Sequence, residues 1–218
     1  MTTHDVRTQA LAAVLAALAG YVVASGFLAT GGYFISFMSG NSTRFGIDAA
    51  QGVRSGAIAA GLIGCFLAGV VIGALVGHAV QHRRRSAVLA IVSILLGASA
   101  GLRAWAATPV IVALMALAMG VVNNVFERNG EVSIGVTYMT GSLVKLGQRI
   151  AVALRGGDRL GWLPYVVLWL SFVVGVVTGA LAYPRVGLAG LWGAATITAA
   201  LAVGCRPRSA RASRSETA

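Results

Sequence analysis

Two short polar motifs, about a hundred residues apart, hold most of the side chains in this sequence that could do chemistry. In each, small polar residues flank a glycine, and a cation follows about one helical turn later. The members are Ser39, Gly40, Asn41 and Arg44 in the first motif and Thr140, Gly141, Ser142 and Lys145 in the second. Such polar residues favour helix N-termini, whose positive end attracts anions, and glycine permits close approach of another group. The motifs therefore predict two short helices that present an anion-binding site.

A simpler interpretation of the same residues stays open. Arg44 could pair with Asp48 four residues later, and Lys145 could meet Glu127 or Glu131. The two motif glycines would then serve only close packing between helices. The sequence does not decide between this interpretation and a substrate-binding role.

The remaining polar candidates are few. Asn123 and Asn124 end an apolar block, where an amide is costly unless it is hydrogen-bonded, so they either join helices or contact substrate. His78 and His82 have a metal-capable spacing but no visible third ligand. No hydrolase, phosphate-loop, zinc or dinucleotide motif is found in its required context. We therefore expect no metal, no cofactor and no enzymatic activity.

The composition places these motifs in a membrane protein. Of the 218 residues, 57% are hydrophobic and 11% charged, and the mean hydropathy of +0.83 is too high for an ordinary soluble domain. Six apolar blocks approach the roughly 20 residues that cross a bilayer. They are residues 11–34, 56–80, 87–102, 110–126, 164–183 and 188–204. The fold class is thus all-α, a polytopic bundle of six transmembrane helices in contact with the lipid bilayer.

The distribution of charge predicts how the chain is oriented. The 17 lysines and arginines divide 13 to 4 between the two sides when six spans are assumed. Those on one side are Arg7, Arg83, Arg84, Arg85, Arg128, Lys145, Arg149, Arg155, Arg159, Arg206, Arg208, Arg211 and Arg214, and those on the other are Arg44, Arg54, Arg103 and Arg185. The positive-inside rule then places both termini in the cytoplasm, with residues 1–10 as the N-terminal segment and 205–218 as a disordered basic tail. It also explains the net charge of +11 without a nucleic-acid partner.

The two halves of the sequence look like copies of one unit. Residues 66–75 match residues 172–181 at seven of ten positions, in the same order as the two polar motifs. Because each unit holds three spans, an odd number, the second copy must cross in the opposite sense. We therefore predict inverted repeats over residues 11–106 and 107–204. The connections at 35–55 and 127–161 favour broken or re-entrant helices, and a further membrane helix at 134–154 stays open.

The residues that carry the motifs also resemble a known family. Residues 31–44, which read Gly-Gly-Tyr-Phe-Ile-Ser-Phe-Met-Ser-Gly-Asn-Ser-Thr-Arg, together with residues 136–141, are similar to the YoaK family (DUF1275). The resemblance implies a six-helix bacterial plasma-membrane protein and no established activity. Family members often carry an acidic residue in a Gly-Tyr-Val-Asp-Ala pattern, at the position of Val23 here. Asn123 and Asn124 keep the amide character of the family's Gln-Asn-Ala.

These observations predict a permease for a small polar or anionic solute. We expect its cavity between the two inverted units, lined by residues 39–41 and 140–142, with alternating access by rocking of one unit against the other. The alternative is a non-transporting scaffold or accessory subunit. The solute, the coupling ion and the oligomeric state are not determined by the sequence.

Overall fold

The computed structural model describes residues 6–53, 56–128 and 131–206 of the chain. The elements in chain order are α1 (Val6–Thr30), α2 (Met38–Ala50), α3 (Gly56–Ala79), η1 (Gln81–Arg83), α4 (Arg84–Leu102), α5 (Thr108–Val122), η2 (Asn123–Phe126), β1 (Glu127–Arg128), β2 (Glu131–Val132), α6 (Met139–Leu154), α7 (Leu163–Val186), η3 (Gly187–Gly190) and α8 (Leu191–Gly204). Arg54 and the predicted disordered tail from residue 207, with Arg208, Arg211 and Arg214, lie outside the described residues.

The prediction of an all-helical polytopic bundle is confirmed. The six apolar blocks correspond to α1, α3, α4, α5, α7 and α8. Within the described residues, five helical stretches are long and apolar enough to cross a membrane, and the last of them, Leu163–Gly204, contains both α7 and α8. Within the region left open at 134–154, residues Met139–Leu154 form α6, an amphipathic helix of 16 residues that is not one of these stretches.

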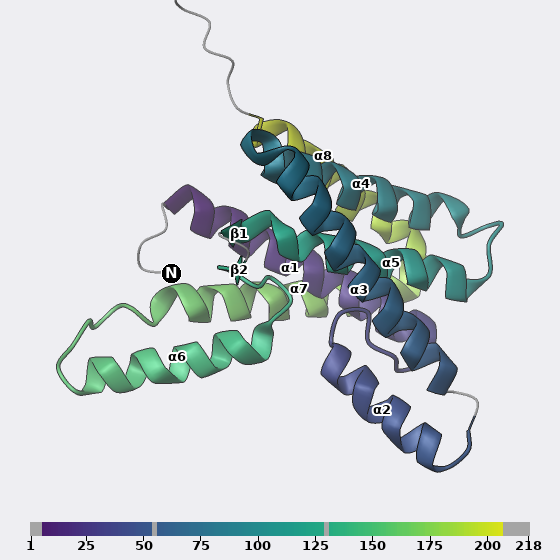
Figure 1. Ribbon diagram of the computed structural model, residues 1–218, viewed down its shortest axis with the longest axis horizontal. Coiled ribbons are helices and arrows are strands. Elements are labelled where there is room, and N and C mark those ends of the chain that lie inside the picture. The colour runs from purple at the N-terminus through teal and green to yellow at the C-terminus, as the bar shows by residue number, and fades with distance from the viewer. Residues whose placement is uncertain (1–5, 54–55, 129–130, 207–218) are drawn as a thin grey trace, which may run out of the picture.

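Two pairs of long helices form the centre of the bundle: α1 packs along α7, and α3 packs along α5 (Figure 1). In both pairs a glycine of one helix touches a backbone carbonyl of the other so closely that an added β-carbon would overlap it. The four contacts are Gly20 with Phe172, Gly175 with Ala17, Gly69 with Leu117 and Gly120 with Phe66. Without a hydrophobic force between helices in lipid, such close backbone packing is a main source of helix association.

Both ends of the described chain lie at one end of the bundle. Helices α4 and α8 run antiparallel, with Ser86 Oγ donating to the Ala202 carbonyl (2.6 Å) and Ser93 Oγ to the Ala195 carbonyl (2.8 Å). Arg85, at the start of α4, also reaches Thr8 in the first turns of α1. The beginning of α1, the α3–α4 turn and the end of α8 are therefore neighbours.

Helices α2 and α6 project from the bundle as two separate arms (Figure 1). The arm formed by α6 extends toward the end at which α1 begins, whereas α2 extends toward the opposite end. The chain first turns back into the bundle: Ile35 is fully buried, lying against Gly26 of α1. Likewise Val136, which precedes α6, is fully buried. Each arm thus begins inside the bundle and leaves it, as predicted for re-entrant segments.

Candidate functional site

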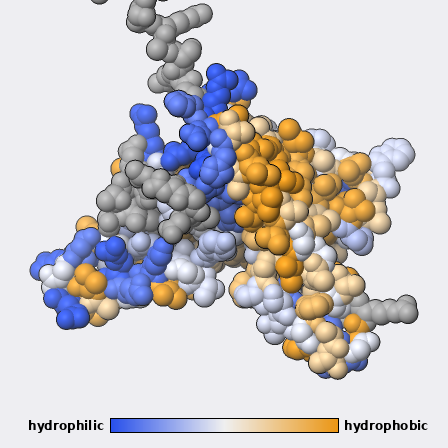
Figure 2. Space-filling model, viewed as in Figure 1, coloured by the Kyte–Doolittle hydropathy of each residue, from blue (hydrophilic) through white to orange (hydrophobic). Residues whose placement is uncertain are grey.

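The two sequence motifs meet at one cavity of about 810 Å³. Its walls come from α1, α3 and α7, and its remaining side is formed by the N-terminal ends of α2 and α6 with the segments that precede them. Phe66 and Phe172, near the middle of α3 and α7, place it midway along the long helices. Figure 2 shows the surface notched between the two arms, on this side of the bundle.

The lining of the cavity is mainly apolar, and its largest group of residues is aromatic or sulfur-containing. The rings and thioethers belong to Phe27, Phe34, Phe37, Met38, Phe66, Tyr138, Met139 and Phe172. Polar groups come from the hydroxyls of Ser36, Ser39, Thr137, Thr140 and Tyr138, and none of the described lining residues carries a charge. Such a cavity suits a small molecule with an apolar body and an uncharged polar group.

In the first motif, Asn41 fixes the re-entrant segment rather than capping a helix. Its side chain is fully buried, with Oδ1 accepting from the Phe34 backbone N–H (3.0 Å) and Nδ2 donating to the Phe34 carbonyl (2.6 Å). The predicted capping role is wrong, because Phe37 is the N-cap of α2 and makes no side-chain cap bond. Asn41 does not line the cavity, but it holds Phe34, which does.

The second segment is fixed by the end of α5 instead. Thr137 Oγ1 donates to Asn123 Oδ1 (2.9 Å), and Asn123 Nδ2 donates to the Met119 carbonyl (2.9 Å). Asn124 Nδ2 donates across to the Val70 carbonyl of α3 (3.2 Å). Of the two interpretations of these asparagines, the contacts support helix joining, and neither asparagine lines the cavity. Solute contact by Asn123 and Asn124 stays a prediction.

Ser142 behaves as Asn41 does, in that it is buried but does not line the cavity. The predicted cap at this motif is also wrong, because Tyr138 is the N-cap of α6 and makes no side-chain cap bond. Ser39, Thr140 and Gly141 are the predicted site residues that do border the cavity.

The two motif cations lie away from the cavity. Arg44 donates to the Gly32 carbonyl and sits over the Tyr33 ring, 4.2 Å from its centroid, so it closes the turn after α1. Lys145 is exposed on α6. Glu127, one of its expected partners, pairs with Arg84 at 2.9 Å. The expectation that these cations make the cavity selective for anions therefore loses its structural basis.

The two motif glycines have different surroundings. A β-carbon at Gly40 would lie 2.5 Å from the Phe37 ring and 3.0 Å from the Phe34 ring, so Gly40 allows these rings to pack. Gly141 has no such neighbour within 4 Å, and it lines the cavity. Only the second glycine faces space that a solute could occupy.

Comparison with known proteins agrees with the membrane architecture. The family model described as "Protein of unknown function (DUF1275)" matches residues 11–204. The chain belongs to the DUF1275 family. It is also 32% identical over 188 residues to a UPF0700 transmembrane protein of Rhizobium meliloti (strain 1021), covering 84% of this chain and 79% of the relative. No solved structure matches the chain. The protein is thus a multi-pass membrane protein of this family.

The structure also places the one departure from the family's pattern. Val23, where the resemblance implies an acidic residue, lies in α1 and lines the cavity. The branched apolar side chain continues the hydrophobic wall formed by Ala24, Phe27 and Leu28. In this DUF1275 protein the position contributes no titratable group to the cavity.

Sequence reasoning missed the aromatic residues, which supply a third of the cavity lining. Phenylalanine is common in any membrane span, so Phe27, Phe34 and Phe37 stand out only once the chain is folded. One signal was available: Phe66 and Phe172 occupy the same position in the two matching segments, and both line the cavity. Their equivalence in the repeat indicates duplication, and only the fold shows that both face the cavity.

Proposed function

We propose that this protein is a permease that moves a small solute through the cavity between the two motif segments. One observation carries the proposal: segments about a hundred residues apart, each with the same motif, turn back into the bundle and meet at a single cavity midway along the spans. Re-entrant backbone at membrane depth is tolerated where it lines a cavity or is buried in protein. A cavity bounded by two half-helix N-termini is a recurring arrangement in secondary transporters.

The proposal includes two inverted repeats, residues 11–106 and 107–204. The glycine contacts support it, because they correspond pairwise: Gly20 against Phe172 in the α1–α7 pair matches Gly120 against Phe66 in the α5–α3 pair. Gly20 and Gly120 are 120 − 20 = 100 residues apart in the sequence, and Phe66 and Phe172 are 172 − 66 = 106 residues apart. The two polar motifs and the two matching segments at 66–75 and 172–181 are separated by similar distances along the chain. The opposite directions of α2 and α6 also support it.

Inversion gives the permease a simple way to alternate access. Most of the helix residues that line the cavity belong to α1 and α7, with Phe66 from α3. The counterparts of α1 and α7 in the other repeat are α5 and α3. If the repeats exchange conformations, an equivalent cavity opens against α5 and α3 and toward the other side of the membrane. The protein lies in the bacterial plasma membrane with both termini cytoplasmic, an orientation supported by the cations at that end, among them Arg7, Arg83 and Arg85.

The solute is a small molecule with an apolar or aromatic body and one uncharged polar group. The rings and methionines would bind the body, because they form most of the apolar part of the wall. The hydroxyls of Ser39 and Thr140, with the free N–H groups of the first turns of α2 and α6, would bind the polar group. An anion would have to leave water without a cation among the described lining residues, which is costly.

The test is uptake into proteoliposomes from a panel of small neutral aromatic and aliphatic alcohols and amides, with carboxylates of matched size alongside. We expect flux for neutral members and none for carboxylates. Gly141→Leu, which fills the cavity, should abolish flux. Gly147→Leu is the matched control, because Gly147 lies on the same helix, has no heavy atom within 4 Å of an added β-carbon and does not line the cavity.

A non-transporting scaffold is the second candidate. The packing of Gly40 against Phe34 and Phe37 favours it, because at this motif the glycine serves the fold and not a cavity. Folded protein that carries none of the panel, with Gly141→Leu and Gly147→Leu equally stable and equally inactive, would support the scaffold over the permease.

A further inference from the structure

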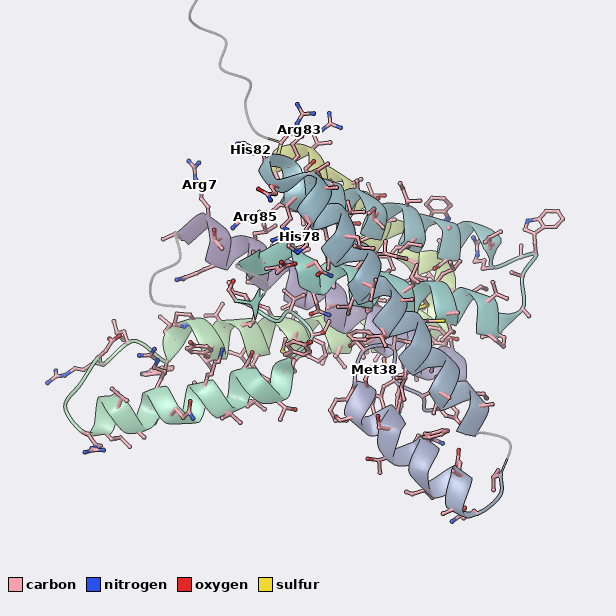
Figure 3. All side chains as sticks on the ribbon, in the orientation of Figure 1. Arg7, Met38, His78, His82, Arg83 and Arg85 are labelled. Atoms are coloured by element: carbon pink, nitrogen blue, oxygen red, sulfur yellow. The ribbon has the colours of Figure 1, made fainter. Side chains whose placement is uncertain are left out.

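A second cavity, of about 410 Å³, lies at the end of the bundle where the beginning of α1, η1, η2 and the end of α8 meet. Its walls are polar where those of the first cavity are apolar. Figure 3 shows Arg7, His82, Arg83 and Arg85 gathered at this end, and Figure 2 shows the same region as a hydrophilic patch beside the apolar face. The solute pathway proposed above does not include this cavity.

The carboxylate of this cavity is already neutralised. Glu127 has a side chain only 5% exposed, and its Oε1 accepts from Arg84 Nη2 at 2.9 Å. Arg84 Nη1 also donates to the Glu127 backbone carbonyl (3.1 Å). The pair therefore contributes no net negative charge to balance the other cations of the wall.

Two further arginines line the cavity without an acidic partner among the described residues. Arg85 Nη1 has a long contact to Thr8 Oγ1 (3.5 Å), and its guanidinium lies 5.6 Å from the centroid of the Phe126 ring. Neither contact neutralises its charge. Arg83 is exposed on the same wall. The cavity is consequently lined by guanidinium donors whose hydrogen-bonding capacity is largely unused.

We infer that this cavity binds a phosphate group, carried by an anionic lipid or by a small soluble phosphate. Guanidinium groups bind phosphate oxygens through paired, charge-assisted hydrogen bonds. The volume accommodates a phosphate with part of the group attached to it. A basic pocket between transmembrane helices, at the end richest in cations, matches the sites at which anionic lipid headgroups bind.

The experiment measures thermal stabilisation of the full-length protein, purified in detergent and stripped of lipid. One arm adds short-chain phosphatidic acid, with short-chain phosphatidylcholine as the zwitterionic control. The other arm adds inorganic phosphate or pyrophosphate, with chloride at matched ionic strength. Each is repeated with Arg85→Gln, with Arg83→Gln and with Arg103→Gln, a control arginine at the α4–α5 end of the bundle that does not line the cavity.

We expect phosphatidic acid to raise the midpoint of unfolding for the unmodified protein and for Arg103→Gln. Arg85→Gln should bind at least about tenfold more weakly, because one charge-assisted hydrogen-bonding group is lost. Stabilisation in the lipid arm alone identifies a lipid headgroup, and stabilisation in both arms identifies the phosphate group itself. If Arg85→Gln fails to fold, the same loss of stabilisation is measured with Arg83→Gln. No stabilisation in either arm, or an equal loss in Arg103→Gln, would overturn the assignment.

Discussion

Replacing a single interhelical glycine by alanine tests the packing on which the cavity depends. Gly69 of α3 is buried, and a β-carbon there would overlap the Leu117 carbonyl of α5. The atom it meets is backbone, so a rotamer change cannot relieve the overlap, and the two helices must separate. Overpacking of this kind costs about 1–3 kcal/mol. A gap of about 0.5–1 Å elsewhere along the pair also removes a quarter to a half of the dispersion energy of the contacts it opens.

Gly64→Ala is the matched control in the same helix. Gly64 is exposed, and no heavy atom lies within 4 Å of its added β-carbon. Alanine there should be neutral or stabilising by up to about 1 kcal/mol through helix propensity. The two variants should therefore differ by roughly 1–4 kcal/mol in the free energy of unfolding. Gly175→Ala, the counterpart in α7, should lose about as much as Gly69→Ala, because its β-carbon meets the Ala17 carbonyl in the same way.

The assay is unfolding of the purified protein in mixed micelles with increasing sodium dodecyl sulfate, followed by circular dichroism. Equal free energies of unfolding for Gly69→Ala and Gly64→Ala would refute the close contact between Gly69 of α3 and the Leu117 carbonyl of α5, because an added β-carbon at Gly69 would then meet no obstacle. A loss confined to Gly69→Ala, with Gly175→Ala unaffected, would contradict the proposed equivalence of the two helix pairs.

Three further predictions concern ionisation and hydrogen bonding. Val23→Asp puts a carboxylate into the apolar wall of the cavity, where no described lining residue is a cation. Burying that charge unpaired is costly, so the midpoint of thermal unfolding at neutral pH should fall, whereas the isosteric Val23→Thr should change it less. Burial raises the pKa of the Cys205 thiol, and the positive charge of Arg85 opposes that shift. In protein that carries Cys65→Ala, so that Cys205 is the thiol that reacts, Arg85→Gln should therefore move the pH midpoint for alkylation of Cys205 by iodoacetamide to a higher value. Asn124→Ala removes the bond to α3 and should cost about 0.6–1.7 kcal/mol in the same unfolding titration.

The sequence predicted the positions of the membrane helices well because hydrophobicity decides them. A span must be long and apolar whatever surrounds it, so six blocks correspond to six helices. The approximate beginnings of α2 and α6 were also predictable, because Met38 and Met139, the first residues of these helices, immediately precede the two motifs. The duplicated segment at 66–75 carries Gly69, whose close contact in the fold has a counterpart at Gly175. These features depend on local composition and on repetition, which a sequence displays directly.

The details of the site were less predictable because they depend on where chain reversals place each side chain. Asn41 has the right type for a helix cap, but the turn after α1 brings the Phe34 backbone to it. Its buried amide bonds both the N–H and the C=O of Phe34 instead. Arg44 was expected at the cavity, but the same turn offers it the Gly32 carbonyl and the Tyr33 ring. In each case the residue type indicated a polar contact, but the sequence did not show where the side chain would point.

The two re-entrant segments are anchored differently, and this difference bears on how the permease would move. Asn41 belongs to α2 and holds Phe34 within the same segment, so the first segment and α2 form one unit. Thr137 is bonded to Asn123 at the end of α5, and the neighbouring Asn124 is bonded to α3, so the second segment is tied to the α3–α5 pair. Any displacement of that pair, which takes one helix from each repeat, relative to α1 and α7 would therefore carry the second segment with it. We expect the cavity to open and close by displacement of Thr137 and Tyr138 relative to α1.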